Sequence, residues 1–247
     1  MAVTSALPWW EEPFLNLSMN LKRIALISIG LNIMGLLLFA GRKTIYRPQP
    51  PKTESTDAYY DKWNQARKSV LDMLPIDSAD IVFVGNSITE GFPLQEMFPG
   101  IHVKNRGIGG NQSRHILGRI QEIAAGHPRK IFFDIGVNDL RAHIPVDSIL
   151  HNYARIIEAV HFLSPRTVIY VQSVFPIGPS YKEIKDSVPA FNLELRHECH
   201  GWQVNFIDLY PLFLQGAYIR PTLTFDDLHL TGAGYALWRQ AIVGYLP

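Results

Sequence analysis

From residue 57 to the end of the chain, short apolar runs alternate with longer segments in which apolar residues recur every three or four positions. The short runs have the length and composition of buried strands, and the longer spacing is typical of amphipathic helices. Strands are predicted at Ile81–Val84, His102–Asn105, Lys130–Ile135, Thr167–Gln172 and Gln203–Ile207. Helices are predicted near residues 60–74, 113–123, 148–163 and 190–198, with a closing helix from Thr231.

Five strands that alternate with helices predict an α/β fold with a five-stranded parallel sheet covered on both faces. In such sheets, ligands bind beyond the carboxyl ends of the strands. We therefore expect the residues just after each strand to carry the chemistry.

The amino-terminal part of the chain contains an uncharged apolar run, Ile24 to Gly41, with Lys22-Arg23 before it and Arg42-Lys43 after it. At a rise of about 1.5 Å per residue the run spans roughly 27 Å, close to the thickness of a bilayer core. It predicts a single transmembrane helix. A cleaved signal peptide is the rival interpretation, but the preceding polar segment is long and no A-x-A-like site follows. A third interpretation is a buried core helix, which is disfavoured because the run has no polar face.

The predicted organisation is an N-terminal segment (1–23), a membrane helix (24–41), a proline-rich spacer (42–56) and a catalytic domain (57–247). Arginine and lysine are more numerous after the apolar run than before it, which by the positive-inside tendency would place the domain in the cytoplasm. Large translocated domains can disobey that tendency. The sequence does not decide on which side of the membrane the catalytic domain lies. For this single-pass anchor, the extracytoplasmic side is preferred.

Composition limits the partners and the chemistry. The formal net charge is +1 and the cations are scattered, so nucleic acid is not an expected partner. Cys199 is the only cysteine, which excludes an intramolecular disulfide and an all-cysteine metal site. His197, Cys199 and His200 cannot all point the same way from one helix, so a structural helix is the favoured interpretation there.

The first predicted strand is followed by Gly85-Asn86-Ser87, where Gly85 is expected to allow a sharp turn and Ser87 to begin a helix. A serine in this place can be activated by a base, and its backbone N–H can face an anion. Taken alone, a serine at a helix start is more often a cap.

Three further groups follow strands or precede the last helix: Asn105–Asn111 (NRGIGGN), Gly136–Asp139 (GVND) and Asp226–His229 (DDLH). Separately, each has an ordinary explanation as a turn, a loop or a chance spacing. Asp134 and Asp139 could also be taken for a catalytic carboxylate pair, although Asp139 more plausibly orders its loop. Together, the groups supply a nucleophile, a base, a carboxylate to orient it and oxyanion donors at one sheet edge.

These four ordered blocks resemble those of the SGNH (GDSL-like) hydrolases, in particular the branch of platelet-activating-factor acetylhydrolase-like enzymes and carbohydrate acetylesterases. The resemblance covers about residues 57–247. It departs from the family at Asn86, where aspartate is common; asparagine keeps the hydrogen-bonding shape but not the charge.

The resemblance implies a flavodoxin-like, three-layer α/β/α sandwich and a serine esterase that needs no cofactor or metal. Ser87, Asp226 and His229 would form the catalytic triad, and Ser87, Gly110 and Asn138 the oxyanion hole. The expected substrate is a small-molecule or glycan ester with a short acyl group such as acetyl, on a carbohydrate or a lipid headgroup. Two alternatives stay open: an acyltransferase that uses the same acyl-enzyme, and an inactive glycan-binding scaffold.

Several aromatic residues are assigned from their positions. Tyr59, Tyr60 and Trp63 have helical spacing and are expected in the core. Phe92, Phe175 and Tyr181 fall in predicted loops near the strand ends and are candidates for lining an acyl pocket.

Overall fold

A parallel sheet forms the centre of the protein, of which this computed structural model describes residues 56–247, with side chains from residue 61. Its five strands lie in the order β2-β1-β3-β4-β5, and every neighbouring pair is parallel. This is the strand order of flavodoxin-like sheets, with a switch point between β1 and β3. The α/β class and the five-stranded parallel sheet are therefore confirmed. The strands are β1 (Ile81–Gly85), β2 (Val103–Gly107), β3 (Lys130–Asp134), β4 (Val168–Gln172) and β5 (Asn205–Ile207).

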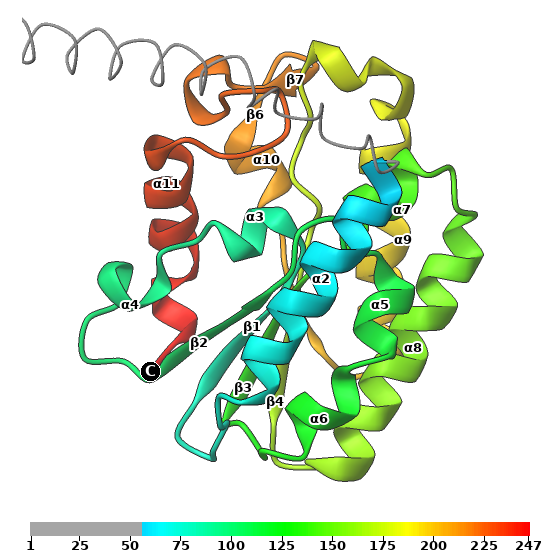
Figure 1. Cartoon of the computed structure of the whole chain (residues 1–247). Helices are drawn as coiled ribbons and strands as arrows, with labels where there is room; N and C mark the ends of the chain where they lie inside the picture. The colour runs from blue at the N-terminus through cyan, green and yellow to red at the C-terminus, as the bar shows by residue number, and fades with distance from the viewer. Residues whose placement is uncertain (1–55) are drawn as a thin grey trace, which may run out of the picture. The chain divides into compact units, whose positions relative to one another are not determined.

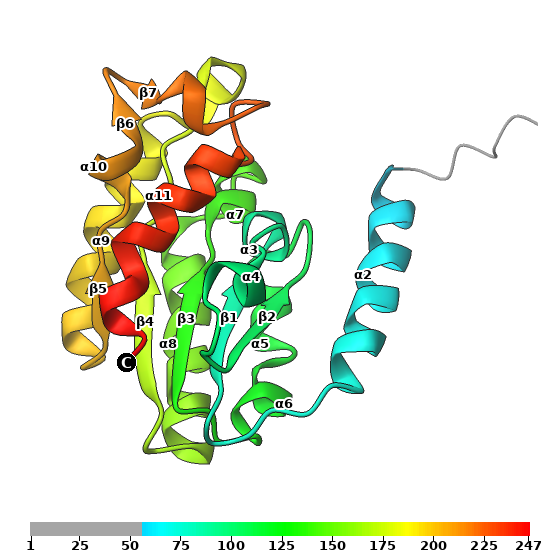
Figure 2. The ribbon, with the colours of Figure 1, turned by 90° about the vertical axis from the view of Figure 1, so that its left-hand side faces the viewer.

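Helices cover both faces of the sheet, which makes the three layers (Figures 1 and 2). The helices that connect β2 through β5 lie on one face, as right-handed crossovers require: α5 (Ser113–Leu117), α6 (Ile120–Ala124), α8 (Val146–Leu163) and α9 (Ser187–Gly201). The other face carries α3 (Ser87–Glu90), α4 (Leu94–Met97) and α11 (Gly232–Ile242).

Short elements lie around these layers. They are α7 (Val137–Arg141), α10 (Tyr210–Phe213), the 3₁₀ helices η1 (Pro179–Ile184), η2 (Pro221–Leu223) and η3 (Val243–Tyr245), and the antiparallel pair β6 (Leu214–Gln215) and β7 (Tyr218–Ile219). The sequence predicts one helix over residues 113–123, but the chain breaks there into α5 and α6 at Gly118-Arg119.

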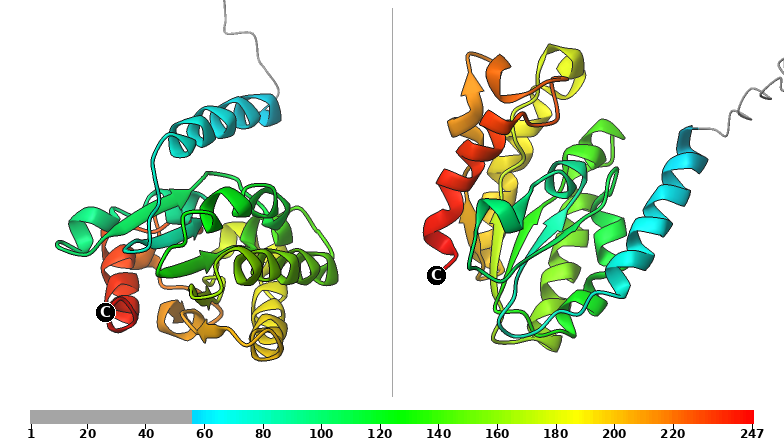
Figure 3. Two further views of the ribbon diagram at one scale, coloured as in Figure 1. Left: turned by 90° about the horizontal axis from the view of Figure 1, so that it is seen from below. Right: turned by 60° about the vertical axis from the view of Figure 1, so that its left-hand side comes forward.

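Helix α2 (Thr56–Asp72) precedes the first strand and lies outside the helical layers (Figure 3). Lys68 joins it to α6 through an ion pair with Glu122 at 2.7 Å. A cavity of about 360 Å³ lies between α2, the segment that follows it, β2 and α6. The helix is confirmed, but the expectation that Trp63 is in the core is wrong, since the residue is 51% exposed. The side chains of Tyr59 and Tyr60 lie outside the described residues.

The predicted membrane helix at 24–41 and the segments that flank it also lie outside the described residues. Within residues 56–247, no helix combines the length and the apolar character that crossing a bilayer requires. The anchor and the four proposed segment boundaries stay predictions.

Aromatic rings fill the layer between the sheet and α11. Phe83, Phe132 and Tyr170 occupy matching register positions on β1, β3 and β4, and their rings stack at 4.7 and 4.6 Å. Trp238 of α11 is fully buried against Phe92 and Phe175. The suggestion that Phe92 and Phe175 line an acyl pocket is therefore wrong, because both are 2% exposed and belong to the core.

The indole of Trp238 gives a test of this packing. Its Nε1–H donates to Oε1 of the buried Gln172 at 2.7 Å. We expect Trp238→Phe to lower the free energy of unfolding by about 2–4 kcal/mol, since it leaves that oxygen unpaired and reduces the ring volume. Phe162→Leu, at a site on α8 that is 83% exposed, is the control and should change stability by less than about 0.5 kcal/mol. Urea unfolding measures both, and equal effects would contradict the packing described.

Candidate active site

Three strands end at one level, and this alignment brings the candidate residues together. In the sheet register, Gly85 at the end of β1 pairs with Gly107 of β2 and with Asp134 of β3. The segments that follow these residues therefore emerge side by side. They are the three blocks that the sequence placed at this edge.

Ser87 is the first residue of α3 and is half-buried. The helix begins directly after β1 because glycine lets it lie against the strand ends: a Cβ on Gly85 would come within 2.1 Å of Thr89 Oγ1. A Cβ on Gly107 would come within 2.2 Å of the backbone nitrogen of Glu90. The chain turns here as expected, from the end of β1 at Gly85 to the start of α3 at Ser87. The φ of Gly85 is not positive, so close approach is what requires glycine there.

Asn86 is the N-cap of α3, and its Oδ1 accepts a hydrogen bond from the N–H of Ile88 at 2.8 Å. This is the bond that an aspartate would also make. The side chain is buried, and its Nδ2 has no partner within the described residues.

Ser87, His229 and Asp226 form a continuous line of hydrogen bonds. The Oγ of Ser87 lies 2.9 Å from Nε2 of His229, and Nδ1 of the same ring lies 2.6 Å from Oδ2 of Asp226. The carboxylate can hold the tautomer in which Nδ1 carries the proton, which leaves Nε2 free to accept one from the serine. The three residues are separated by up to 142 positions in the chain, and the fold brings them together.

The Asp226 carboxylate is held in its ionised form. Burial acts to raise its pKa, but hydrogen bonds from the His229 ring and from the backbone N–H groups of His229 and Leu228 outweigh that effect, so the pKa lies below its ordinary value. An ionised carboxylate here stabilises the imidazolium that forms when His229 takes a proton.

Asp227 has a different task from its neighbour. Its φ is +71°, and its Oδ2 accepts a hydrogen bond from the Ser180 N–H at 2.9 Å and one from the Ser180 hydroxyl. Its backbone oxygen accepts from the Gly178 N–H at 2.7 Å. Asp227 therefore ties the loop that carries Asp226 and His229 to the loop after β4.

The expected oxyanion donors lie beside the serine. Ser87 is at the first position of its helix, where a backbone N–H has no intrahelical acceptor. Gly110 is exposed and has φ of +72°, and within residues 56–247 no group accepts from its N–H. The Nδ2 of Asn138 donates one hydrogen bond to the Asn111 carbonyl at 3.1 Å, which leaves a second N–H for a ligand.

Two arginines that the sequence analysis did not single out support these groups. Arg119 is 5% exposed and donates to the carbonyls of Gly85 and Arg106 and to Asn111 Oδ1. Burial lowers the pKa of its guanidinium to about 10. Arg141 donates to Asn138 Oδ1 at 3.4 Å, which directs the amide nitrogen the other way. The contacts of Arg119 join separate elements, so no local motif could reveal them, whereas Arg141 and Asn138 lie three residues apart on α7.

Asp134 and Asp139 do not form a pair. Asp139 accepts from the N–H and the hydroxyl of Ser113, the latter at 2.6 Å, and so orders the start of α5 as expected. Asp134 lies under α3 and accepts from Thr89 Oγ1 at 3.1 Å.

The cluster on α9 also has a structural explanation. Cys199 is 1% exposed, and burial raises the pKa of its thiol to about 12. Across residues 56–247, no three His, Cys, Asp or Glu side chains come together in a way that could hold a metal ion.

A hydrogen-bonded serine, histidine and aspartate beyond the strand ends of a parallel sheet is the arrangement that serine hydrolases use. The sequence model of the GDSL-like Lipase/Acylhydrolase family matches residues 83–237. The chain belongs to this family, whose other name is the SGNH hydrolases, and it is therefore a hydrolase that acts on esters.

Individual relatives agree with the family. The chain is 27% identical over 185 residues to platelet-activating factor acetylhydrolase IB subunit alpha2 of Rattus norvegicus, covering 71% of this chain and 80% of the relative. It is 25% identical over 164 residues to subunit alpha1 of Mus musculus, covering 63% and 70%.

Solved structures agree on the fold. A protein from Streptococcus pneumonia, provisionally described as a platelet activating factor, superposes with a TM-score of 0.70 at 26% identity over 77% of this chain and 96% of that one. A GDSL-like lipase from Bacteroides thetaiotaomicron gives 0.64 at 24% identity over 76% and 96%.

Asp134 predicts a pH dependence of stability. Burial raises the pKa of its carboxyl to about 7, above the value of about 3.9 for an unfolded chain. Between about pH 4 and 7 the folded state binds more protons, so this group lowers stability as pH rises and has no further effect above pH 7. Asp134→Asn removes the effect, and we expect the stability of the variant relative to wild type to rise over that window by on the order of 4 kcal/mol. Urea unfolding from pH 4.5 to 8 measures it; a difference that does not vary with pH would contradict the assignment.

Proposed function

We propose that the protein is a serine esterase that hydrolyses short-chain O-acyl esters, acetyl esters in particular, through an acyl-enzyme on Ser87. The observation that carries this proposal is the line of hydrogen bonds from Ser87 Oγ to His229 Nε2 at 2.9 Å and from His229 Nδ1 to Asp226 at 2.6 Å. Such a line supplies a nucleophile, its base and the group that orients the base.

In the first half-reaction, Ser87 Oγ attacks the ester carbonyl carbon while His229 Nε2 takes the hydroxyl proton. The carbonyl oxygen becomes an oxyanion, which the N–H groups of Ser87 and Gly110 and the amide of Asn138 stabilise. The tetrahedral intermediate then collapses. Its bond to the alcohol oxygen breaks, and the imidazolium of His229 returns the proton to that oxygen.

In the second half-reaction, His229 takes a proton from water, and the resulting hydroxide attacks the acyl-enzyme. Collapse of this intermediate breaks the bond to Ser87 Oγ, which regains the proton from His229. The products are a carboxylic acid and an alcohol, and Asp226 remains ionised throughout, in agreement with its lowered pKa.

Two observations favour a short acyl group. The mammalian relatives are named acetylhydrolases. Of five cavities of about 310 to 460 Å³ on the described residues, none is lined by Ser87, Asp226 or His229. Phe92 and Phe175, two of the three aromatic residues expected to line an acyl pocket, are in the core instead. An acetyl group needs little enclosure, whereas a long chain would need an apolar chamber.

The rim of the site suits a substrate that carries its ester on a polar body. Phe225 is 71% exposed and stacks beside the His229 ring, with centroids 5.8 Å apart. The Arg141 guanidinium lies 4.9 Å from the centre of the Tyr181 ring. Aromatic faces and a cation at the rim can contact the leaving group, which supports an acetylated carbohydrate or a lipid headgroup as the substrate.

Replacement of the nucleophile tests the mechanism. We expect Ser87→Ala to lower kcat on an acetyl ester by on the order of 10⁴ to 10⁶, with the fold retained by circular dichroism. His229→Ala should lose nearly as much, and the double variant should be scarcely worse than either single one because the two residues act as a unit. Ser187→Ala, which alters another serine at the start of a helix, is the control and should leave kcat unchanged. Ser87→Ala activity within tenfold of wild type would reject the proposal.

The acyl preference is tested separately with aryl esters of graded chain length. We expect acetyl and propionyl esters to have kcat/KM values roughly tenfold or more above that of the octanoyl ester, because a longer chain that gains no burial still loses conformational freedom when its ester is positioned. The assay is run below the critical micelle concentration of the octanoyl ester. A preference for eight or more carbons would identify a lipase or lysophospholipase instead.

A further inference from the structure

The loop that carries Gly110 has little intrinsic rigidity. Gly107, Gly109 and Gly110 leave three of its positions without side chains, and glycine has the widest conformational freedom of any residue. An oxyanion donor must nevertheless point in a fixed direction before the charge forms. Contacts from outside the loop must therefore fix it.

Glu90 supplies such a contact. Its Oε2 accepts a hydrogen bond from the backbone N–H of Gly109, the residue before Gly110, at 2.7 Å. A bond from an amide to a carboxylate is shorter and stronger than one between neutral groups. Within residues 56–247, no other side chain accepts from the N–H of Ile108, Gly109 or Gly110.

Glu90 and Ser87 lie on the same four-residue helix, α3. The bond from Glu90 therefore connects the helix of the nucleophile to the loop of the oxyanion donor. The two are already in contact, since a Cβ on Gly109 would lie 3.8 Å from Ser87 Cβ and 3.2 Å from Glu90 Oε2. A shift of this loop would change the distance between the attacking oxygen and the Gly110 N–H.

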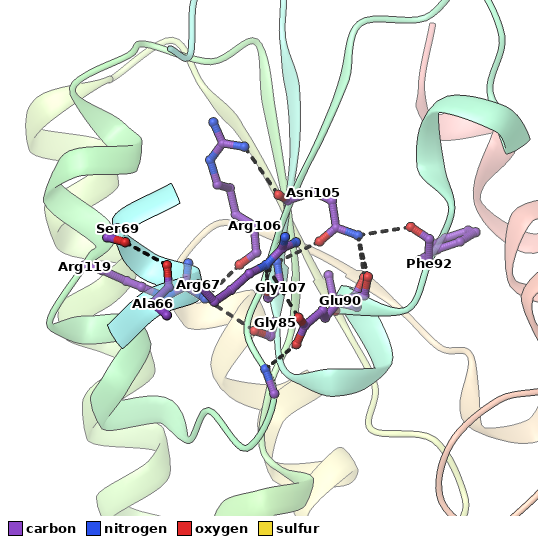
Figure 4. A network of polar contacts seen from close by, with 12 residues as sticks. Ala66, Arg67, Ser69, Gly85, Glu90, Phe92, Asn105, Arg106, Gly107 and Arg119 are labelled. Atoms are coloured by element: carbon purple, nitrogen blue, oxygen red, sulfur yellow. Dashed lines mark hydrogen bonds and ion pairs between the residues drawn. The ribbon is translucent and has the colours of Figure 1, made fainter. Parts of the chain in front are cut away.

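Arg67 of α2 completes the contact from the other side (Figure 4). Its Nε lies 3.5 Å from Glu90 Oε1 and 3.5 Å from the carbonyl oxygen of Gly107. The side chains of Arg67 and Glu90 are 29% and 23% exposed, so solvent screens the pair only in part. Arg67 thus directs one carboxylate oxygen to itself and leaves the other for Gly109.

Other hydrogen bonds hold the end of α3, so ending the helix is a separate role from holding the Gly109 N–H. Asn105 Nδ2 donates to the carbonyls of Thr89, Glu90 and Phe92. These bonds fix the backbone of the helix but not the Gly109 N–H. The carboxylate of Glu90 is thus not needed to end the helix.

We propose that Glu90 is a positioning residue for the oxyanion loop and that Arg67, by orienting Glu90, makes α2 part of the active-site support. This inference rests on the proposed esterase function. It adds Glu90 and Arg67, which do not touch the substrate, to the residues that support the active site. It also adds helix α2, which precedes the family-matched region at 83–237.

The test uses the full-length chain and p-nitrophenyl acetate. We expect Glu90→Ala to lower kcat roughly 10- to 100-fold with KM within about threefold, since the loop matters more to the transition state than to the bound ester. Glu90→Gln should recover part of the loss, because its side-chain oxygen can still accept from Gly109. Arg67→Met should lower kcat by about three- to tenfold and add nothing further in the Glu90→Ala background.

The control is the other ion pair that joins α2 to a different element. Lys68→Met removes the 2.7 Å contact with Glu122 on α6 and should leave kcat unchanged. A second readout is the affinity of 1,1,1-trifluoroacetone, whose ketone carbon forms an oxyanion adduct with the serine oxygen. This affinity should weaken by the same factor as kcat in each Glu90 and Arg67 variant.

The outcomes are distinct. Wild-type kcat in Glu90→Ala, with Ser87→Ala inactive, would overturn the inference and leave the esterase function standing. Equal losses in Lys68→Met and Arg67→Met would assign the effect to general docking of α2 and would also overturn it. Activity that survives Ser87→Ala would reject the function itself. If Glu90→Ala fails to fold, as thermal unfolding would show, Glu90→Gln and Arg67→Met decide the question by the same kcat and ketone measurements.

Discussion

The close approach of α3 to the strand ends is the constraint on which the site depends. Thr89 and Glu90 lie where a Cβ on Gly85 or Gly107 would stand, so the helix can lie this close only because both positions are glycine. The approach puts Ser87 at the level where β1, β2 and β3 end. It also brings the carboxylate of Glu90 to the oxyanion loop and the hydroxyl of Thr89 to Asp134. A helix one side chain further out would lose all of these contacts together.

The carboxyl groups near α3 differ in pKa because they differ in burial and in hydrogen bonding. Asp226 is partly exposed and gathers three hydrogen bonds, which keep its pKa low and the carboxylate ionised beside the base. Asp134 is fully buried with one hydrogen bond from Thr89, and its pKa rises to about 7. The pKa values of the two carboxyl groups thus differ because Asp226 accepts three hydrogen bonds and is partly exposed, whereas the buried Asp134 accepts one. Only the first has the fixed charge that an imidazolium partner needs.

The sequence predicts the strands, their parallel arrangement and the residues that meet at the sheet edge, because the first three strands and the last helix are each marked by a short polar or glycine-rich motif. It does not predict which apolar residues face solvent. Trp63 has helical spacing like a core residue, yet α2 lies outside the layers and leaves it exposed, whereas Phe92 and Phe175 fall in loops that fold back into the core. The contacts of Glu90, Arg67 and Arg119 join separate elements, so they follow from packing and not from any one segment.

Asn86 illustrates how these constraints meet at one position. Its Oδ1 caps α3 as an aspartate would, while its Nδ2 is buried without a partner within the described residues, which costs stability. An aspartate would avoid that cost and would favour the helix N-terminus. It would also bury a second carboxylate next to the register pair of Gly85 and Asp134, where burial already disfavours ionisation. Asparagine therefore keeps the cap of α3 without adding another buried carboxylate beneath the nucleophile, at the cost of one unpaired N–H.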